Sequence, residues 1–122
     1  MFASHHRLNN LTVIIDRNNI QIDGMTEKVM PLEPLAQKYK AFNWQVLEID
    51  GNNIEQFVDA VHEAQAIYER PTAIIAHTIP GKGVDFMEFD YHWHSKPFTA
   101  EEAREALHQL RTLENKVQSE HQ

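Results

Sequence analysis

The chain has 122 residues, a formal net charge of −7 at pH 7 and no cysteine. This length suits one domain with its own core, and the acidic balance argues against nucleic-acid binding, which requires a basic face. Without cysteine, neither a disulfide framework nor a thiolate site is available. No apolar run reaches the roughly 18 to 20 residues that span a bilayer, and the N-terminus lacks the pattern of a signal peptide. We expect a cytoplasmic protein that binds neither nucleic acid nor membrane.

Three segments have the composition of buried strands. Residues 11–15 (LTVII) are continuously apolar and β-branched, which predicts a strand with both faces covered. Residues 44–49 (WQVLEI) alternate, with Trp44 expected in the core, and residues 72–76 (TAIIA) have the composition of a central strand. Because these strands alternate with helical patterns, the sequence predicts an α/β fold: a parallel sheet with helices on both faces.

Helical spacing occupies the intervals between the strands. Residues 32–41 (LEPLAQKYKA) predict a short helix, with Pro34 in its first turn. Residues 53–69 predict a longer helix, with Asn52 or Asn53 as its N-cap. Its apolar stripe consists of Ile54, Phe57, Val58, Val61, Ala64 and Tyr68.

A last helix is predicted after Thr99, because Thr99 and Glu102 have the spacing of a capping box. Its apolar stripe consists of Ala103, Ala106, Leu107, Leu110 and Leu113. Residues 115–122 are polar and are expected to fray, whereas residues 1–7 resemble the end of a helix that leads into the first strand. A sheet of three strands leaves an open edge, so we expect 1–122 to be one incomplete domain that another segment or chain covers.

Two long loops follow the carboxyl ends of strands, where ligands bind in open α/β sheets. The first, residues 16–31, begins with Asp16, Arg17 and Asn18. Asparagine and backbone oxygens are ligands suited to Mg²⁺ or Ca²⁺. The same side chains also favour a simple turn, because they hydrogen-bond their own backbone. The residues themselves leave the turn and the metal site as alternatives.

The second loop, residues 78–98, contains a glycine-rich turn at 80–83 (PGKG) and a cluster of aromatic and histidine side chains. His92 and His94 are two residues apart, so on an extended strand they share a face and can bind a metal such as zinc. A single histidine that acts as a general acid or base is the favoured alternative.

Three segments in the same order resemble the N-terminal, thiamine diphosphate-binding domain of transketolase, especially the form encoded as a separate subunit. These segments read LNNLTVIIDRNNIQIDG, VMPLEPLAQKYKAFNWQVLEIDG and PTAIIAHTIPGKGVDFMEFDYHWHSKPF. The resemblance extends from Met1 to about Leu113. The synthase that makes deoxyxylulose phosphate is a related family, but LEPLAQKYKAFNW and Trp93-His94 are more similar to transketolase.

The resemblance implies specific roles for three residues. Asn18 matches the asparagine whose side-chain oxygen binds Mg²⁺, and the backbone carbonyl of Ile20 contacts the same ion. The Ile20 side chain is expected near the thiazolium ring. His94 matches a catalytic histidine near the cofactor diphosphate and the reacting oxygens of the substrate. Here Ser95 replaces the family glycine, and Lys82 is given no catalytic role.

The implied reaction transfers a two-carbon ketol unit between sugar phosphates, and the cofactor supplies its carbanion chemistry. In the family, the cofactor motif starts with Gly-Asp-Gly, a segment that the resemblance places before Met1. The implied partner is the pyrimidine-binding C-terminal subunit, in a homo- or hetero-oligomer. We therefore expect the chain alone to bind thiamine diphosphate weakly or not at all and to be inactive. The alternative is a non-enzymatic interaction module, and a His92/His94 metal protein ranks last.

Overall fold

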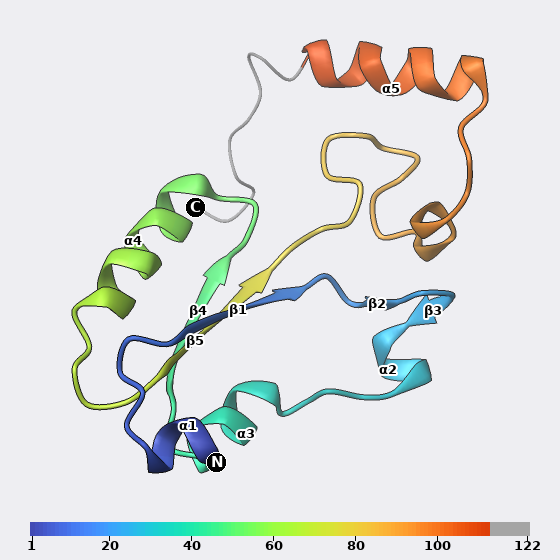
Figure 1. The fold of residues 1–122 in the computed structure, drawn as a ribbon. Coiled ribbons are helices and arrows are strands. Elements are labelled where there is room, and N and C mark those ends of the chain that lie inside the picture. Colours follow the sequence, from blue (N-terminus) through green and yellow to red (C-terminus); the bar gives the residue numbers. More distant parts are fainter. Residues whose placement is uncertain (113–122) are drawn as a thin grey trace. The chain divides into compact units, whose positions relative to one another are not determined.

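The computed structural model describes residues 1–112 and divides into two compact units (Figure 1). The first unit consists of Met1–Arg17 and Leu32–Thr78. The second consists of Asn18–Pro31 and the chain from Ile79 onward. The organisation of the whole chain as one incomplete domain stays a prediction.

The first unit contains the predicted parallel sheet, in the strand order β1-β5-β4. The strands are β1 (Thr12–Arg17), β4 (Gln45–Asp50) and β5 (Thr72–His77). Ile14 of β1 and Leu47 of β4 both align with Ile74 of the central strand. β5 is buried from Thr72 to Ala76, as its β-branched composition predicts.

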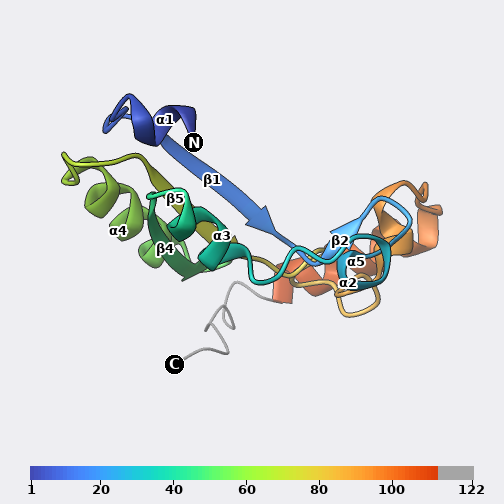
Figure 2. The ribbon, with the colours of Figure 1, turned by 90° about the horizontal axis from the view of Figure 1, so that it is seen from below.

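Helices lie on both sides of this sheet (Figures 1 and 2). The helices are α1 (Phe2–His5), α3 (Leu35–Ala41) and α4 (Ile54–Gln65). α4 packs against β4 and β5, where Ala60, Ala64 and Ile74 form a buried cluster. On α3, the ring of Tyr39 meets that of half-buried Trp44 edge-on, with 5.5 Å between centroids. The predicted α/β architecture is confirmed.

The structure corrects the bounds and the buried stripe of two helices. α3 begins after Pro34, whereas the prediction placed this proline inside the first turn. Asn53 is the N-cap of α4, since its side chain accepts a hydrogen bond from the Gln56 N–H. α4 ends at Gln65, so Tyr68 lies beyond it and is exposed. Ile54 is also exposed, and the buried side chains are those of Ala60 and Ala64, whose small size permits close approach to the sheet.

The prediction that the first strand is covered on both faces is wrong. Burial alternates along β1, and the Ile14 side chain is 50% exposed. Within residues 1–112, β1 pairs with β5 on one edge and with no strand on the other. Since α4 packs over β4 and β5, the same face of β1 stays open. That another segment or chain covers this edge stays a prediction.

Because the hydroxyl of Thr72 is buried, we expect that a substitution which removes it stabilises the fold. Its Oγ1 has no hydrogen-bond partner among the described residues, although the side chain is fully buried. Because an unsatisfied buried polar group costs about 1–3 kcal/mol, we expect Thr72→Val to raise the free energy of unfolding by about 1 kcal/mol. Denaturant unfolding measures this change. Thr12→Val is the control, since Thr12 is the exposed register partner of Thr72, and equal effects would contradict the prediction.

The second unit contains short elements from both long loops and the last helix. These are β2 (Ile20–Gln21), β3 (Gly24–Met25), α2 (Thr26–Val29), the 3-10 turn η1 (Tyr91–His94) and α5 (Ala100–Thr112). The capping box is confirmed: the Thr99 N–H donates to Glu102 Oε2 at 2.8 Å, and the Glu102 N–H donates to Thr99 Oγ1 at 3.2 Å. No helix among residues 1–112 combines the length and apolar character that a membrane crossing requires.

The apolar stripe predicted for α5 is not buried in the described structure. Leu107 is 53% exposed and Leu110 is 45% exposed. Leu113, the last member of that stripe, lies outside the described residues, as does the tail at 115–122 that was expected to fray. Burial of this stripe therefore needs contacts beyond those of the described residues.

Candidate functional site

The Asn18 segment forms a turn whose geometry is set by the asparagine side chain. Asn18 Oδ1 accepts a hydrogen bond from the Ile20 N–H at 3.1 Å. Asn19 has φ of +65°, a left-handed conformation that asparagine tolerates. The Asn19 carbonyl accepts the Thr26 N–H at 2.9 Å, which ties the turn to the start of α2. The turn predicted from the residues is present, and it holds an amide oxygen and the Ile20 carbonyl within one short segment.

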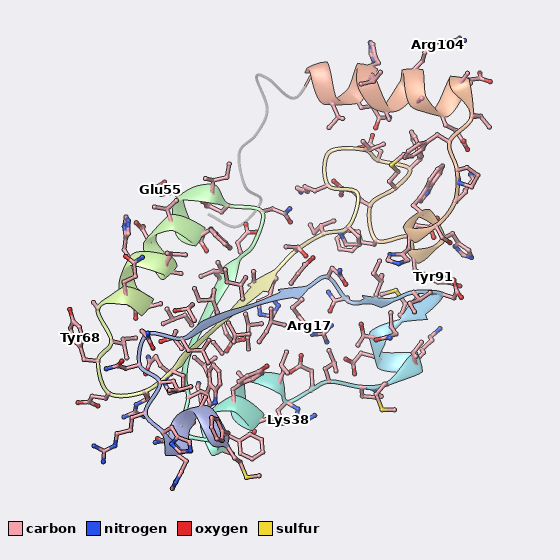
Figure 3. All side chains as sticks on the ribbon, viewed as in Figure 1. Arg17, Lys38, Glu55, Tyr68, Tyr91 and Arg104 are labelled. Carbon is pink, nitrogen blue, oxygen red and sulfur yellow. The ribbon has the colours of Figure 1, made fainter. Side chains whose placement is uncertain are left out.

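The second unit brings this turn and the His94 segment together through one hairpin. Ile20 of β2 pairs with Met25 of β3 in an antiparallel ladder. β3 in turn packs against η1, the 3-10 turn that ends at His94. Figure 3 shows Tyr91, the first residue of η1, beside this hairpin. Two segments about seventy residues apart in the sequence thus belong to one compact unit.

His92 and His94 do not share a face as the zinc prediction requires. They lie in a 3-10 turn, where residues two apart are about 120° apart around the axis. His92 is engaged locally, since its Nδ1 lies 2.6 Å from Asp90 Oδ1. The His92 backbone and ring hydrogen bonds hold the pKa of Asp90 below its usual range. Among residues 1–112, no group of three histidine, aspartate or glutamate side chains is placed to hold a metal ion.

The His94 side chain is exposed and makes no hydrogen bond or ion pair within the described residues. Its imidazole is therefore available for a ligand. The following residue, Ser95, has φ of −132°, which any residue adopts. The replacement of the family glycine by serine accordingly causes no backbone strain at this position.

The glycine-rich turn before His94 depends on its glycines. Gly81 and Gly83 have φ of +75° and +93°. A Cβ on Gly81 would lie 2.6 Å from Met87 Cβ and 2.8 Å from the Met87 backbone. Lys82 lies 3.9 Å from Glu88 Oε1, and the Gly83 N–H donates to the same oxygen at 2.9 Å. These contacts place Lys82 beside Glu88 in the turn, and its lack of a catalytic role stays a prediction.

Trp93 organises the second loop, a role that could not be predicted from its position in the sequence alone. Its Nε1 donates a hydrogen bond to the Phe86 carbonyl at 2.8 Å. Its ring lies 5.2 Å from that of Phe86 and stacks on Phe98 at 5.8 Å between centroids. The aromatic spacing of FMEFDYHWHSKPF was the signal in the sequence for such a cluster.

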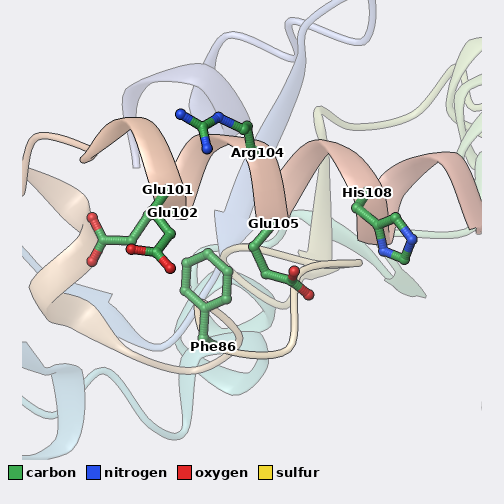
Figure 4. A pocket seen from close by; sticks show the side chains of 6 residues that line it. All are labelled: Phe86, Glu101, Glu102, Arg104, Glu105 and His108. Carbon is green, nitrogen blue, oxygen red and sulfur yellow. The ribbon is translucent and has the colours of Figure 1, made fainter.

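A shallow pocket of about 570 Å³ lies along α5 in the second unit (Figure 4). Its lining consists of Phe86, Glu101, Glu102, Arg104, Glu105 and His108. The three glutamates make it unsuited to a phosphate-bearing ligand, because like charges repel. None of the predicted site residues lines it.

In the first unit, charged side chains gather at the carboxyl end of the sheet. Arg17 is almost fully buried at the end of β1 (Figure 3), and its Nη2 lies 3.2 Å from Glu33 Oε1. His77 of β5 pairs with Glu48 of β4 at 3.3 Å. The Arg17–Glu33 pair joins the two chain positions that flank the excursion carrying Asn18 and Ile20. Sequence reasoning missed it, since neither residue has a periodic or motif signal.

The Glu33 carboxylate predicts a pH-dependent contribution to stability. Its pKa lies below the ordinary 4.5 because it accepts the Leu35 N–H, and Arg17 lowers the pKa further. A carboxylate whose pKa is lower in the folded protein than in the unfolded chain stabilises the fold fully above its unfolded-state pKa. This stabilisation is lost as pH falls through the folded-state pKa. We therefore expect the stability difference between wild type and Glu33→Gln to shrink below pH 4.5. Denaturant unfolding across pH measures it, and a difference that grows on acidification would contradict the prediction.

The residues present meet only part of what a Mg²⁺–diphosphate site requires. Asn18 Oδ1 and the Ile20 carbonyl are neutral oxygens of the right chemistry, yet Mg²⁺ demands a near-octahedral cage and usually a carboxylate. Asn18 Oδ1 also accepts the Ile20 N–H, which an amide oxygen with two lone pairs can do while it contacts a cation. This turn alone does not form a complete site.

Residues 1–117 match the family described as the thiamine diphosphate-binding domain of transketolase. The chain is 38% identical over 120 residues to an apulose-4-phosphate transketolase subunit of Phocaeicola vulgatus. It is 41% identical over 110 residues to a 6-deoxy-6-sulfo-D-fructose transketolase subunit of a Clostridium species. These alignments cover 98% and 90% of this chain but 43% and 40% of the relatives, so the chain spans less than half of their length.

Solved structures agree with this assignment. The transketolase of Campylobacter jejuni aligns with 90% of this chain and 17% of its own, at 30% identity and a TM-score of 0.81. A Pichia stipitis transketolase complex with sedoheptulose 7-phosphate aligns at 27% identity and the same TM-score, over 90% of this chain and 16% of its own. The chain therefore belongs to the transketolase family, within its thiamine diphosphate-binding domain, and the resemblance found in the sequence is confirmed.

Proposed function

We propose that this chain forms part of a two-subunit, thiamine diphosphate-dependent transketolase of the cytoplasm. In this proposal the complete enzyme transfers a two-carbon ketol group between sugar phosphates. The partner is the pyrimidine-binding C-terminal subunit, whose contact with this chain makes a hetero-oligomer. The names of two relatives, which call them transketolase subunits, support a divided enzyme of this kind.

The observation that carries the proposal is the joint placement of Asn18, Ile20 and His94 in the second unit. β2 and β3 connect the Asn18 turn to η1, so the three residues with implied roles belong to the same local structure. A surface turn with no function does not require this association with an exposed histidine from a distant segment. The family match supports thiamine diphosphate as the ligand.

Each residue has a definite role in the proposed site. The Asn18 side-chain oxygen and the Ile20 carbonyl contribute to a Mg²⁺ site, which Ca²⁺ can also occupy, and other segments supply its remaining ligands. The Ile20 side chain would lie near the cofactor ring. His94 would lie near the cofactor diphosphate and the substrate, where its imidazole would donate or accept a proton. The bound cofactor supplies the carbanion chemistry of the reaction.

A thermal-shift titration tests the proposal on the chain itself. Native-state ligands raise the melting temperature by mass action. Because the Asn18 turn supplies only two neutral oxygens, we expect little shift with millimolar Mg²⁺ and thiamine diphosphate for the chain alone. A clear shift is expected when the segment that carries Gly-Asp-Gly (the completing segment) and the partner subunit are also present. The absence of a shift in the complete assembly would favour the non-enzymatic interaction module instead.

A further inference from the structure

The imidazole of His94 has no internal support among the described residues, so its position depends on its neighbours in the chain. It makes no hydrogen bond or ion pair there. The residue before it is held firmly: Trp93 donates to the Phe86 carbonyl and contacts the Phe86 and Phe98 rings. Trp93 is thus the anchor of the His94 backbone.

Lys96 contacts the Trp93 ring. Its Nζ lies 3.9 Å from the centroid of the Trp93 ring, which is a cation–π contact. The same ammonium group lies 2.8 Å from Glu102 Oε1. One cation therefore connects the anchor of His94 to the first turn of α5.

Glu102 fixes Lys96 with one carboxylate oxygen and the helix with the other. Its Oε2 accepts the Thr99 N–H at 2.8 Å, within the capping box of α5. The hydrogen bond from Lys96 and that from the Thr99 backbone lower the pKa of Glu102 from its ordinary 4.5 to about 2. The carboxylate is therefore charged at any pH at which the protein is expected to work.

We propose that Lys96 and Glu102 are positioning residues for His94: the ion pair holds the ammonium group on Trp93 and thereby sets the backbone from which His94 projects. The proposal rests on the role proposed for His94 in the enzyme. It extends that role to two residues that contact neither substrate nor cofactor. It also gives α5 a role in the site. The first turn of this helix holds Glu102, which binds Lys96, and Lys96 in turn contacts Trp93.

One substitution can remove the ion pair with Lys96 and keep the capping box. Glu102→Gln keeps an oxygen for the Thr99 N–H, because glutamine also completes a capping box, but it removes the charge that binds Lys96. Glu101→Gln is the matched control, with the same charge change in the same helical turn and no contact with Lys96. Lys96→Arg retains a cation that can stack on Trp93, so it is the rescue variant. Lys96→Met removes the cation but keeps an apolar stem.

The first measurement uses nuclear magnetic resonance spectra of the 122-residue chain, without any ligand. We expect Glu102→Gln and Lys96→Met to shift and broaden the Trp93 indole N–H and His94 amide resonances. Glu101→Gln and Lys96→Arg should leave them near their wild-type positions, and the Trp44 indole should not move in any variant. Equal spectra for Glu102→Gln and Glu101→Gln at Trp93 and His94 would overturn the proposal.

The second measurement uses the chain assembled with the completing segment and partner subunit. Misplacement of a catalytic group by a fraction of an ångström lowers rates steeply, so we expect a roughly three- to tenfold lower kcat for Glu102→Gln. Melting temperature and the KM of the sugar phosphate should stay near wild type for Glu102→Gln, and Lys96→Arg should keep most of the wild-type kcat. Altered resonances with unchanged kcat would overturn the functional part. If the wild-type assembly shows no activity, the proposed function is rejected. The comparison of resonances still tests whether Lys96 and Glu102 position His94.

Discussion

Replacing Ile74 by alanine is expected to lower the free energy of unfolding by about 3 kcal/mol. Ile74 is fully buried at the centre of β5 and belongs to the cluster with Ala60 and Ala64 of α4. Both neighbouring strands are hydrogen-bonded to β5, so the surrounding backbone has little freedom to fill the cavity left by the lost side chain. Denaturant unfolding monitored by circular dichroism measures the change.

Ile14→Ala provides the matched control for this prediction. Ile14 is the register partner of Ile74 on the same face of the sheet, but its side chain is 50% exposed. Because only part of its apolar area leaves water on folding, we expect a loss of about 1 kcal/mol. Equal losses for the two substitutions would mean that α4 and the sheet do not form the core described above, or that another part of the protein covers β1.

Replacing Asn18 by alanine is expected to weaken Mg²⁺-dependent binding of thiamine diphosphate in the complete assembly by about 100-fold. The substitution removes the side-chain oxygen proposed as a metal ligand, and with it the hydrogen bond to the Ile20 N–H that shapes the turn. Titration of the assembly with Mg²⁺ at saturating cofactor, followed by activity and by melting temperature, measures the loss.

Two further variants separate a ligand role from a turn role at this position. Asn18→Asp keeps an acceptor for the Ile20 N–H and an oxygen for the metal, so it should retain most of the Mg²⁺ affinity. Asn19→Gly suits the left-handed backbone at residue 19 and leaves the Asn18 side chain in place, so binding should persist. If Asn18→Ala binds Mg²⁺ and cofactor as tightly as wild type, Asn18 is a turn residue and nothing more.

Local patterns in the sequence predicted the parts of the fold that depend on neighbouring residues. The β-branched run at 72–76 became the buried central strand β5. The Thr99–Glu102 spacing became a complete capping box, with both of its hydrogen bonds formed. These features follow from backbone propensity and side-chain reach over a few residues, which a single sequence encodes directly.

Features that depend on tertiary contacts were predicted poorly. The composition of residues 11–15 predicted a fully covered strand, but coverage depends on what packs beside β1, and Ile14 is half exposed. The 16–31 loop contains a hairpin with only two residues in each strand, too short for a periodic signal. The extended strand assumed for His92 and His94 is a 3-10 turn, because Asp90 caps it through the His92 N–H.

In the candidate site, too, local features were predicted from the sequence and tertiary contacts were not. The polar residues after the first strand indicated either a turn or a metal site, and the resemblance to transketolase assigned Asn18, Ile20 and His94. The path that joins them, from Ile20 through β3 to η1, and the support of His94 by Trp93, Lys96 and Glu102 arise only in the folded unit. Pairings between distant side chains leave no periodic trace in the sequence.

The most direct test of the proposed function is a ketol-transfer assay of the chain combined with the segment that carries Gly-Asp-Gly and with the pyrimidine-binding subunit. The proposed function predicts turnover of a ketose phosphate and an aldose phosphate that requires both thiamine diphosphate and Mg²⁺. It further predicts that Asn18→Ala and His94→Ala each reduce this turnover severely, while the chain alone shows none. Turnover by the chain alone, or full turnover by an assembly that carries Asn18→Ala, would contradict it.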